Sequence, residues 1–312
     1  MTTANGPLDD LRREVDEIDR AMHELLMRRA ALAERIGAAK ETSARADGAA
    51  ADYLRPAREA AVLRGLIARH SGSFPLPSLV RLWREIMSSL LRLQGPFSAA
   101  VFMAGGHGGS NWPGLWDLAR DHYGSGTPLI PCQSAMHVLR EVTEGEATVG
   151  LLPYPEEGEA MPWWPLVANT RASEPKIIAR LPFVAAAPGG PGRGAVSALV
   201  VARLTPEETG DDRSLLMLEI AEDVSRARFM AALAAVGLPS RWQVAGPEQA
   251  GAGSRLHLVE IEGFVTSDDP RLAKFADALG AVLFRIAVLG AYASPLTLDE
   301  PQRTLGAASA AR

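Results

Sequence analysis

The chain has 312 residues, of which 47% are hydrophobic and 22% charged, with a formal net charge of −5 at pH 7. This length and composition predict a folded protein of two or three domains and exclude a largely disordered chain. The negative net charge provides no overall basic field, so no nucleic-acid partner is expected and an anion site would need locally placed arginines.

The first predicted element is one long helix from Pro7 to about Lys40, which would span roughly 50 Å at the usual helical rise. Its apolar residues step by three and four without a break, and this is the pattern of a heptad seam. An arginine occupies one seam position, where a leucine is due. The seam residues are Leu8, Leu11, Val15, Ile18, Met22, Leu25, Arg29, Leu32 and Ile36. We expect the two following helices to help cover this seam.

Two further amphipathic helices follow. One begins near Pro56, a residue favoured in the first helical turn, and the other covers SLVRLWREIMSSLLRLQ and ends at Gly95 and Pro96. The apolar seam expected on the third helix consists of Leu79, Leu82, Ile86, Leu90 and Leu93. Residues 7–95 are therefore predicted to form an all-α domain.

The rest of the chain alternates short apolar runs with helical periods. AAVFMAG, TPLIPC, ATVGLLPY, KIIARLPFVAAA and AVSALVVAR are typical of buried strands, so residues 97–205 are predicted to form an α/β domain. The later segments follow the order βαββαβ, which predicts a ferredoxin-like domain at 212–296. Trp163 and Trp164, in a proline-rich loop, are expected to pack internally.

Polar residues gather where the helical domain should be buried. Eleven residues separate Arg29 from Lys40, so both cations point the same way, about 16 Å apart along the helix. Arg58 and Glu59 lie in the first turn of the second helix, and Gln94 ends the third. Each cation could pair with a carboxylate of the chain, such as Glu34 or Glu59, or with water. A dianionic ligand is the more economical explanation for the whole group, because guanidinium matches carboxylate geometry.

These residues resemble the all-α chorismate mutase family, whose motif series is matched by LDDLRREVDEIDRAMHELLMRRAALAERIGAAK, RPAREAAVL and WREIMSSLLRLQ. The resemblance implies an isomerase that converts chorismate to prephenate, without cofactor or metal, in aromatic amino acid biosynthesis. It implies that the substrate carboxylates bind Arg12, Arg29 and Arg58. It places Lys40 and Gln94 at the ether oxygen and Glu59 at the ring hydroxyl. The chain departs from the family at Leu90, where a serine is frequent.

Arg12 lies 17 residues before Arg29, about 25 Å along the helix and about 100° around it, so one helix cannot aim both at one small ligand. In the family, two chains intertwine their first helices and the counterpart of Arg12 reaches into the partner's pocket. The sequence therefore predicts a homodimer with two equivalent sites.

The order of the three domains resembles the bifunctional chorismate mutase/prephenate dehydratase proteins, with an ACT-type regulatory domain at the end. Pro155, Glu156 and Glu157 stand in place of the dehydratases' Glu-Asn-Ser triplet, and residues 197–199 in place of Thr-Arg-Phe. We therefore expect a degenerate dehydratase-like region. Three alternatives stay open: a bifunctional enzyme, a non-catalytic regulatory or partner-binding subunit, and a pyruvate lyase acting on isochorismate.

Location and cofactors are predicted from what the sequence lacks. The single cysteine, Cys132, excludes an internal disulfide framework and favours a reducing, cytoplasmic location. The start has no basic and apolar leader, and the apolar run around Arg285 is too short for a comfortable membrane span, so no membrane association is expected. The scattered histidines predict no metal site.

Overall fold

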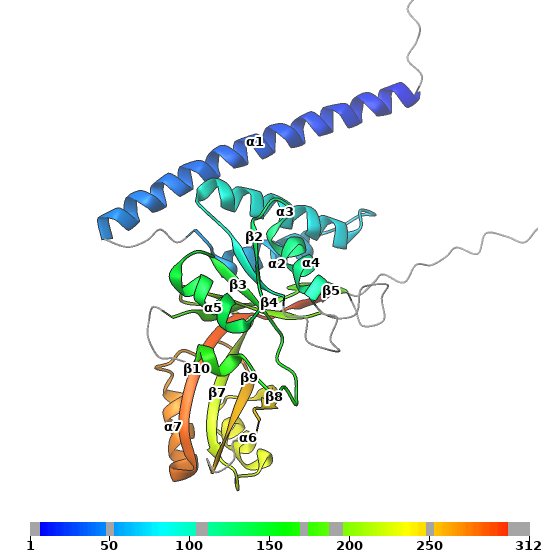
Figure 1. Cartoon of the computed structure of the whole chain (residues 1–312). Helices are drawn as coiled ribbons and strands as arrows, with labels where there is room; N and C mark the ends of the chain where they lie inside the picture. The colour runs from blue at the N-terminus through cyan, green and yellow to red at the C-terminus, as the bar shows by residue number, and fades with distance from the viewer. Residues whose placement is uncertain are drawn as a thin grey trace, which may run out of the picture.

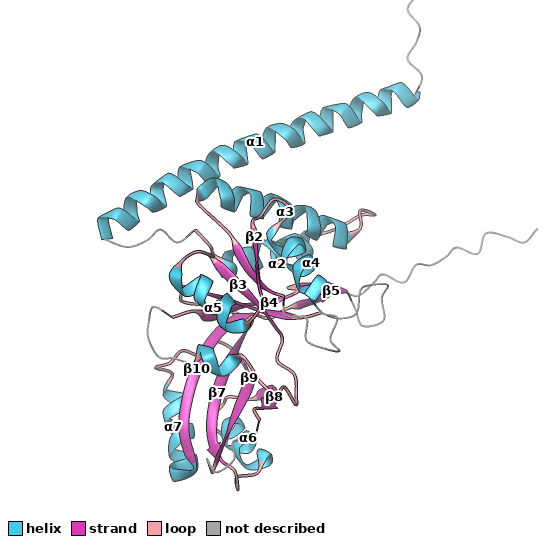
Figure 2. Cartoon of the chain, viewed as in Figure 1, coloured by secondary structure: helices cyan, strands magenta, loops and turns pink. Residues whose placement is uncertain are grey.

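The computed structural model describes residues 7–47, 53–103, 112–168, 174–186, 196–247 and 253–298. Three helices come first, followed by a mixed sheet with helices on its faces and a second helix-covered sheet region (Figures 1 and 2). The predicted order of helices and strands is confirmed. Among these described residues, no helix is long and apolar enough to cross a membrane.

The N-terminal helices are α1 (Pro7–Asp47), α2 (Pro56–Arg69) and α3 (Leu76–Gln94). Proline in the first turn of α2 and α3 suits the helical start, where no backbone N–H partner is available in any case. In Figure 1, α1 crosses one side of the molecule, and its N-terminal half extends beyond every other element. Only its C-terminal half lies against α3.

The expectation that α2 and α3 cover the α1 seam is wrong within one chain. Leu25 is 64% exposed and Leu32 47% exposed, and the rest of the apolar seam is similarly open. The helix α3 packs instead against a neighbouring stripe, where Ala33 and Gly37 are the buried residues. Small side chains let the two helix backbones approach closely, which explains why this stripe, and not the leucine seam, makes the contact.

The seam predicted for α3 is also only partly buried, because Leu82 is 50% and Leu93 46% exposed. The buried residues of α3 form another stripe at steps of three and four: Val80, Arg84, Ser88 and Leu91. This stripe faces the α/β region, with α4 (Trp112–Tyr123) packed against it. A stripe that contains arginine and serine gives no hydrophobic signal, so the sequence pattern pointed to the wrong face.

The central sheet is mixed. Its strands are β1 (Ala99–Phe102), β2 (Leu129–Cys132), β3 (Val149–Pro153), β4 (Lys176–Leu181) and β6 (Ala198–Ala202), in the order β2-β1-β3-β6-β4. Strands β1, β2 and β3 are parallel, whereas β6 runs antiparallel to both of its neighbours. The helix α5 (Ala135–Glu144) connects β2 to β3, and its N-cap Ser134 accepts a hydrogen bond from the His137 backbone N–H.

The C-terminal part follows the predicted βαββαβ order. It comprises β7 (Asp212–Ala221), α6 (Arg226–Ala235), β8 (Ser240–Ala245), β9 (Ser254–Glu262), α7 (Pro270–Leu279) and β10 (Leu283–Ala293). Its strands lie in the order β10-β7-β9-β8, which places the first and last strands of the unit side by side. This arrangement is that of a ferredoxin-like unit.

Within the described residues, the two sheets join into one nine-stranded sheet, a feature that the sequence did not predict. Strand β10 pairs in parallel with β4 at Gly290 and Ile177. A Cβ on Gly290 would lie 2.0 Å from the Ile177 carbonyl oxygen, and Gly290 has φ +149°. Glycine is therefore required at the junction. A short pair, β5 (Val184–Ala186) and β11 (Leu296–Leu298), adds a second link between the two parts.

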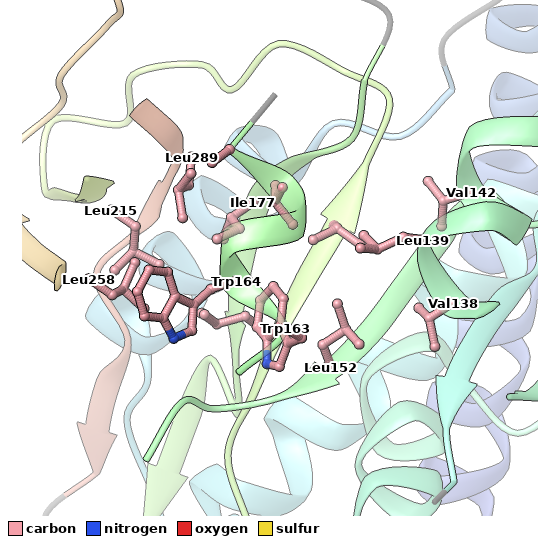
Figure 3. Packing of buried hydrophobic residues seen from close by; sticks show 14 of the residues in the cluster. Val138, Leu139, Val142, Leu152, Trp163, Trp164, Ile177, Leu215, Leu258 and Leu289 are labelled. Carbon is pink, nitrogen blue, oxygen red and sulfur yellow. The ribbon is translucent and has the colours of Figure 1, made fainter. Parts of the chain in front are cut away.

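A hydrophobic cluster fills the space between the sheet regions (Figure 3). Trp163 and Trp164 are 4% and 1% exposed, and the Trp163 indole N–H donates to the Pro153 carbonyl at 2.9 Å. Around them lie Val138 and Leu139 of α5 and Leu215 and Leu258 of the ferredoxin-like unit. The prediction that the tryptophans pack internally is confirmed.

The helical region is fused to the rest through shared cores. Leu54 and Leu91 belong to the cluster that also contains Phe97 and residues of α4 and the central sheet. Leu63 of α2, with no exposed surface, packs in a cluster that includes Phe183, from the turn after β4. The predicted helical domain therefore packs directly against the α/β region and shares hydrophobic cores with it.

Candidate functional site

The helices α1 and α3 come into close contact at Gly37, beside the C-terminal residue of α3. A Cβ on Gly37 would lie 2.6 Å from the Gln94 carbonyl oxygen and 2.8 Å from the Gln94 Cα, so only glycine allows this contact. Gln94 ends α3 with its side-chain amide donating to the Leu90 carbonyl at 3.3 Å. The crossing point thus fixes Gln94 against α1.

Lys40 lies three residues after Gly37, which places both on the same face of α1. Its Nζ donates to the Tyr53 carbonyl oxygen at 3.2 Å and lies 5.9 Å from the centre of the Tyr53 ring. Tyr53 also donates from its hydroxyl to Glu41 at 3.1 Å. The ammonium is therefore held near the α1–α3 crossing, on the helix stripe that faces the protein.

Arg29 lies two turns before Gly37, on the border of the same stripe, and is partly buried. Burial lowers the pKa of the Arg29 guanidinium, and the positive charge of Arg58 lowers it further. Within the part of the chain that the structure describes, neither guanidinium forms a hydrogen bond or ion pair. Two cations close enough to repel each other form a local positive field suited to an anion.

Glu59 has a partner that the sequence analysis missed. Its Oε2 accepts from the Arg84 guanidinium at 2.9 Å, in an ion pair where the Arg84 side chain is 8% and the Glu59 side chain 21% exposed. Burial raises the pKa of Glu59 and lowers that of Arg84, and each partner opposes the shift of the other. The carboxylate that Arg29 could have used is thus already paired.

Arg12 lies far from these residues. It pairs with Asp9, one turn earlier on the same helix, at 3.2 Å, with its own side chain 68% exposed. About 25 Å of helix separates it from Arg29. In Figure 1, α1 is one continuous helix, which agrees with the prediction that one chain cannot bring Arg12 and Arg29 to the same small ligand.

The structure therefore gathers Lys40 and Gln94 at the α1–α3 crossing and brings Arg29 near Arg58. It turns Glu59 toward α3 and leaves Arg12 apart. The roles assigned to these residues stay predictions. The sequence analysis missed two residues that contact the candidate site: Arg84, which pairs with Glu59, and Tyr53, which accepts a hydrogen bond from Lys40. Arg84 shares its buried stripe of α3 with only two apolar residues, Val80 and Leu91, so no hydrophobic pattern in the sequence indicated that it is buried.

Comparison with known proteins gives a family match over the helical region. Residues 11–95 match the chorismate mutase type II family. A curated relative from Pseudomonas aeruginosa, described as a bifunctional chorismate mutase/prephenate dehydratase, is 32% identical over 146 residues, which are 47% of this chain and 38% of the relative. The matched region thus spans well under half of that protein.

Similar solved structures cover about two thirds of the chain at low similarity. One, titled as a novel type of quorum quenching acylase, GqqA, has a TM-score of 0.44 and 18% identity, covering 63% of this chain and 95% of its own. A prephenate dehydratase from Streptococcus mutans has a TM-score of 0.42 and 14% identity, covering 64% and 98%. These values are too low to indicate a function. What the comparison establishes is that residues 11–95 of this chain are similar to the type II chorismate mutase family.

Proposed function

We propose that the chain converts chorismate to prephenate at a site formed by its N-terminal helices, with no cofactor or metal. The observation that carries this proposal is the family match over residues 11–95, which coincides with the helices that hold the cationic residues. The mutual repulsion of Arg29 and Arg58 supports it, because a dicarboxylate such as chorismate would neutralise both charges.

The reaction needs no acid, base or nucleophile, since it is a [3,3] rearrangement within one molecule. The site must hold the substrate in a folded conformer and stabilise the negative charge that grows on the ether oxygen. We assign Arg29 and Arg58 to the carboxylates, Lys40 and Gln94 to the ether oxygen, and Glu59 to the ring hydroxyl. Lys40 and Gln94 are partly buried at the α1–α3 crossing, which strengthens their contacts relative to water.

We further propose a homodimer in which Arg12 completes the site of the partner. The support is the apolar seam of α1, whose residues are about half exposed or more from Leu8 to Ile36. A contiguous apolar stripe of this length is costly in water and matches a coiled-coil surface. A second copy supplies both a cover for the seam and an Arg12 for the site.

The test is the fall of chorismate absorbance with the purified full chain. Lys40→Ala should lower turnover by about two to three orders of magnitude, the usual loss when a donor to developing charge is removed. Lys274→Ala is the matched control, because Lys274 lies on the exposed side of α7, and it should retain normal turnover. Near-normal turnover of Lys40→Ala would remove Lys40 from its assigned role.

The products separate the alternatives. Prephenate alone supports the proposal, and salicylate with pyruvate from isochorismate identifies the lyase. Phenylpyruvate from prephenate identifies a bifunctional enzyme, the activity named for the relatives. We expect none, because Ala198 and Leu199 are fully buried apolar residues of β6 in place of a reactive signature. Binding without turnover would support a non-catalytic subunit.

The domain boundaries 7–95, 97–205 and 212–296, the ACT type of the ferredoxin-like unit and the cytoplasmic location remain parts of this proposal. The βαββαβ order and the strand order β10-β7-β9-β8 support the ACT type. The single Cys132 permits no internal disulfide, which supports a reducing location. Burial raises the pKa of its thiol to about 11 and favours an inert, packed role.

A further inference from the structure

The buried ion pair between Glu59 and Arg84 lies where the helical region meets the rest of the chain. Arg84 belongs to the stripe of α3 that faces the α/β region, and its side chain is only 8% exposed. A buried guanidinium is costly unless it is paired, and Glu59 is the acid that pairs with it. The pair therefore fixes the direction of the Glu59 side chain.

The second half of the chain in turn fixes Arg84. The Arg84 guanidinium lies 5.7 Å from the centre of the Phe183 ring, within the range of a cation–π contact. Phe183 is 6% exposed and packs with Ala60, Leu63 and Val80 of α2 and α3. Its backbone carbonyl accepts from the Leu296 N–H at 2.7 Å, so its position depends on the segment after β10.

The same junction contains a cavity of about 50 Å³, lined by Glu59 and Arg84 together with residues of α4, β4 and β10. The other titratable groups around it are His122 at the end of α4, Arg180 on β4, Tyr292 on β10 and the ion pair of Arg55 with Glu207. Tyr123, next to His122, also interacts electrostatically with both members of the pair. The junction is thus polar inside an otherwise apolar contact.

We propose that Arg84 is a positioning residue of the mutase site, which holds Glu59 through the buried ion pair, and that Phe183 anchors Arg84 from the second half of the chain. This inference rests on the proposed function, in which Glu59 meets the ring hydroxyl. The ion pair uses Oε2 of Glu59, while 21% of the Glu59 side chain stays exposed to receive a ligand. The region after Gln94 therefore contributes to the mutase site without supplying a group that touches substrate.

The first test is the pH profile of kcat/KM for chorismate in Arg84→Met. Loss of the guanidinium leaves Glu59 buried without its cation, so its pKa rises and the acid limb of the profile moves to higher pH. Arg84→Lys keeps a charge and should restore the limb in part. Arg92→Met is the matched control: Arg92 lies on the same helix and donates to Thr127 at 2.9 Å, away from Glu59. It should leave the limb in place.

A double-mutant cycle separates positioning from general damage. If Arg84 acts through Glu59, adding Arg84→Met to Glu59→Gln should change kcat/KM by less than threefold, whereas alone it should cost at least tenfold. Equal losses in both backgrounds would overturn the proposal. Phe183→Leu should shift the acid limb in the same direction, whereas Phe97→Leu, which removes an equally buried ring from the neighbouring cluster, should not. A shift in both would also refute it.

The second test needs no turnover. In protein labelled with ¹³C at glutamate carboxyls, the resonance that Glu59→Gln removes belongs to Glu59, and its titration midpoint should rise in Arg84→Met and in Phe183→Leu. If wild-type protein does not convert chorismate, the proposed function fails while this titration still decides the positioning link. An unchanged midpoint in Arg84→Met overturns the link even if the enzyme is active.

Discussion

The contact at Gly37 allows a sharp test of the geometry at the α1–α3 crossing. In Gly37→Ala the new Cβ would lie 2.6 Å from the Gln94 carbonyl oxygen and 2.8 Å from its Cα. Both are backbone atoms that cannot rotate away. Restoring an ordinary separation of about 3.5 Å requires the helices to move apart by about 1 Å. Lys40, one turn further along α1, would move with the helix and away from Gln94.

The expected losses follow from that displacement. Overpacking costs about 1–3 kcal/mol, against which alanine gains about 1 kcal/mol over glycine in a helix, so stability should fall by about 0–2 kcal/mol. A misplacement of about 1 Å can cost a hundredfold in rate. We therefore expect kcat/KM for chorismate to fall by about a hundredfold, or about 2.7 kcal/mol in the barrier, while most of the protein stays folded.

Gly65→Ala is the matched control, because its new Cβ would meet only the end of the flexible Arg69 side chain, at 3.3 Å. It should keep full turnover and gain up to about 1 kcal/mol in the free energy of unfolding. Chorismate consumption and denaturant unfolding measure the two quantities. If Gly37→Ala behaves like Gly65→Ala in both assays, the crossing does not set the position of Lys40.

Two further predictions concern the dimer and the effect of pH. Leu25→Glu places a charge on the 64%-exposed seam and should convert a dimer to monomers in light scattering, whereas Met27→Glu, on the opposite side of the helix, should not; a dimer that survives Leu25→Glu contradicts the seam interface. Burial, helped by Arg255 and Arg226, lowers the pKa of His257 to about 4. As the pH falls, His257 takes up a proton in the unfolded chain at a higher pH than in the folded chain. The free energy of unfolding therefore decreases as the pH drops from about 6.5 towards 4. His257→Leu should flatten that part of the pH–stability curve, and an unchanged slope would count against the shifted pKa.

Much of the fold could be predicted from local patterns. The strands of both sheets are short apolar runs between turn residues, and the helices carry strong periods, so their order follows from the sequence. The face that each helix buries was harder to predict. Apolar periodicity indicates α1 residues such as Leu25, yet the contact within the chain uses Ala33 and Gly37. Small residues make close contacts but contribute little to a hydrophobic pattern.

The candidate site shows the same limit. Arg29 could be identified because it stands where the pattern calls for an apolar residue, and Lys40 because its spacing places it on the same face of the helix. The partner of Glu59 could not be identified, because pairing depends on how α3 turns toward the α/β region. The continuity of the sheet at Gly290 was also hidden, since it rests on a parallel contact between segments more than 100 residues apart.

The shared cores explain why experiments on the helical domain need the whole chain. Truncation after Gln94 would uncover Leu54 and Leu91, which are 2% and 6% exposed, and would remove Phe183 from beside Leu63. Each fully buried leucine contributes about 1.5–3 kcal/mol, a large share of the 5–15 kcal/mol that typically stabilises a folded protein. The truncated helices would also leave Arg84 paired but unanchored. Loss of turnover after truncation would therefore report a loss of structure, and only substitutions in the intact chain can separate the chemistry of the site from its support.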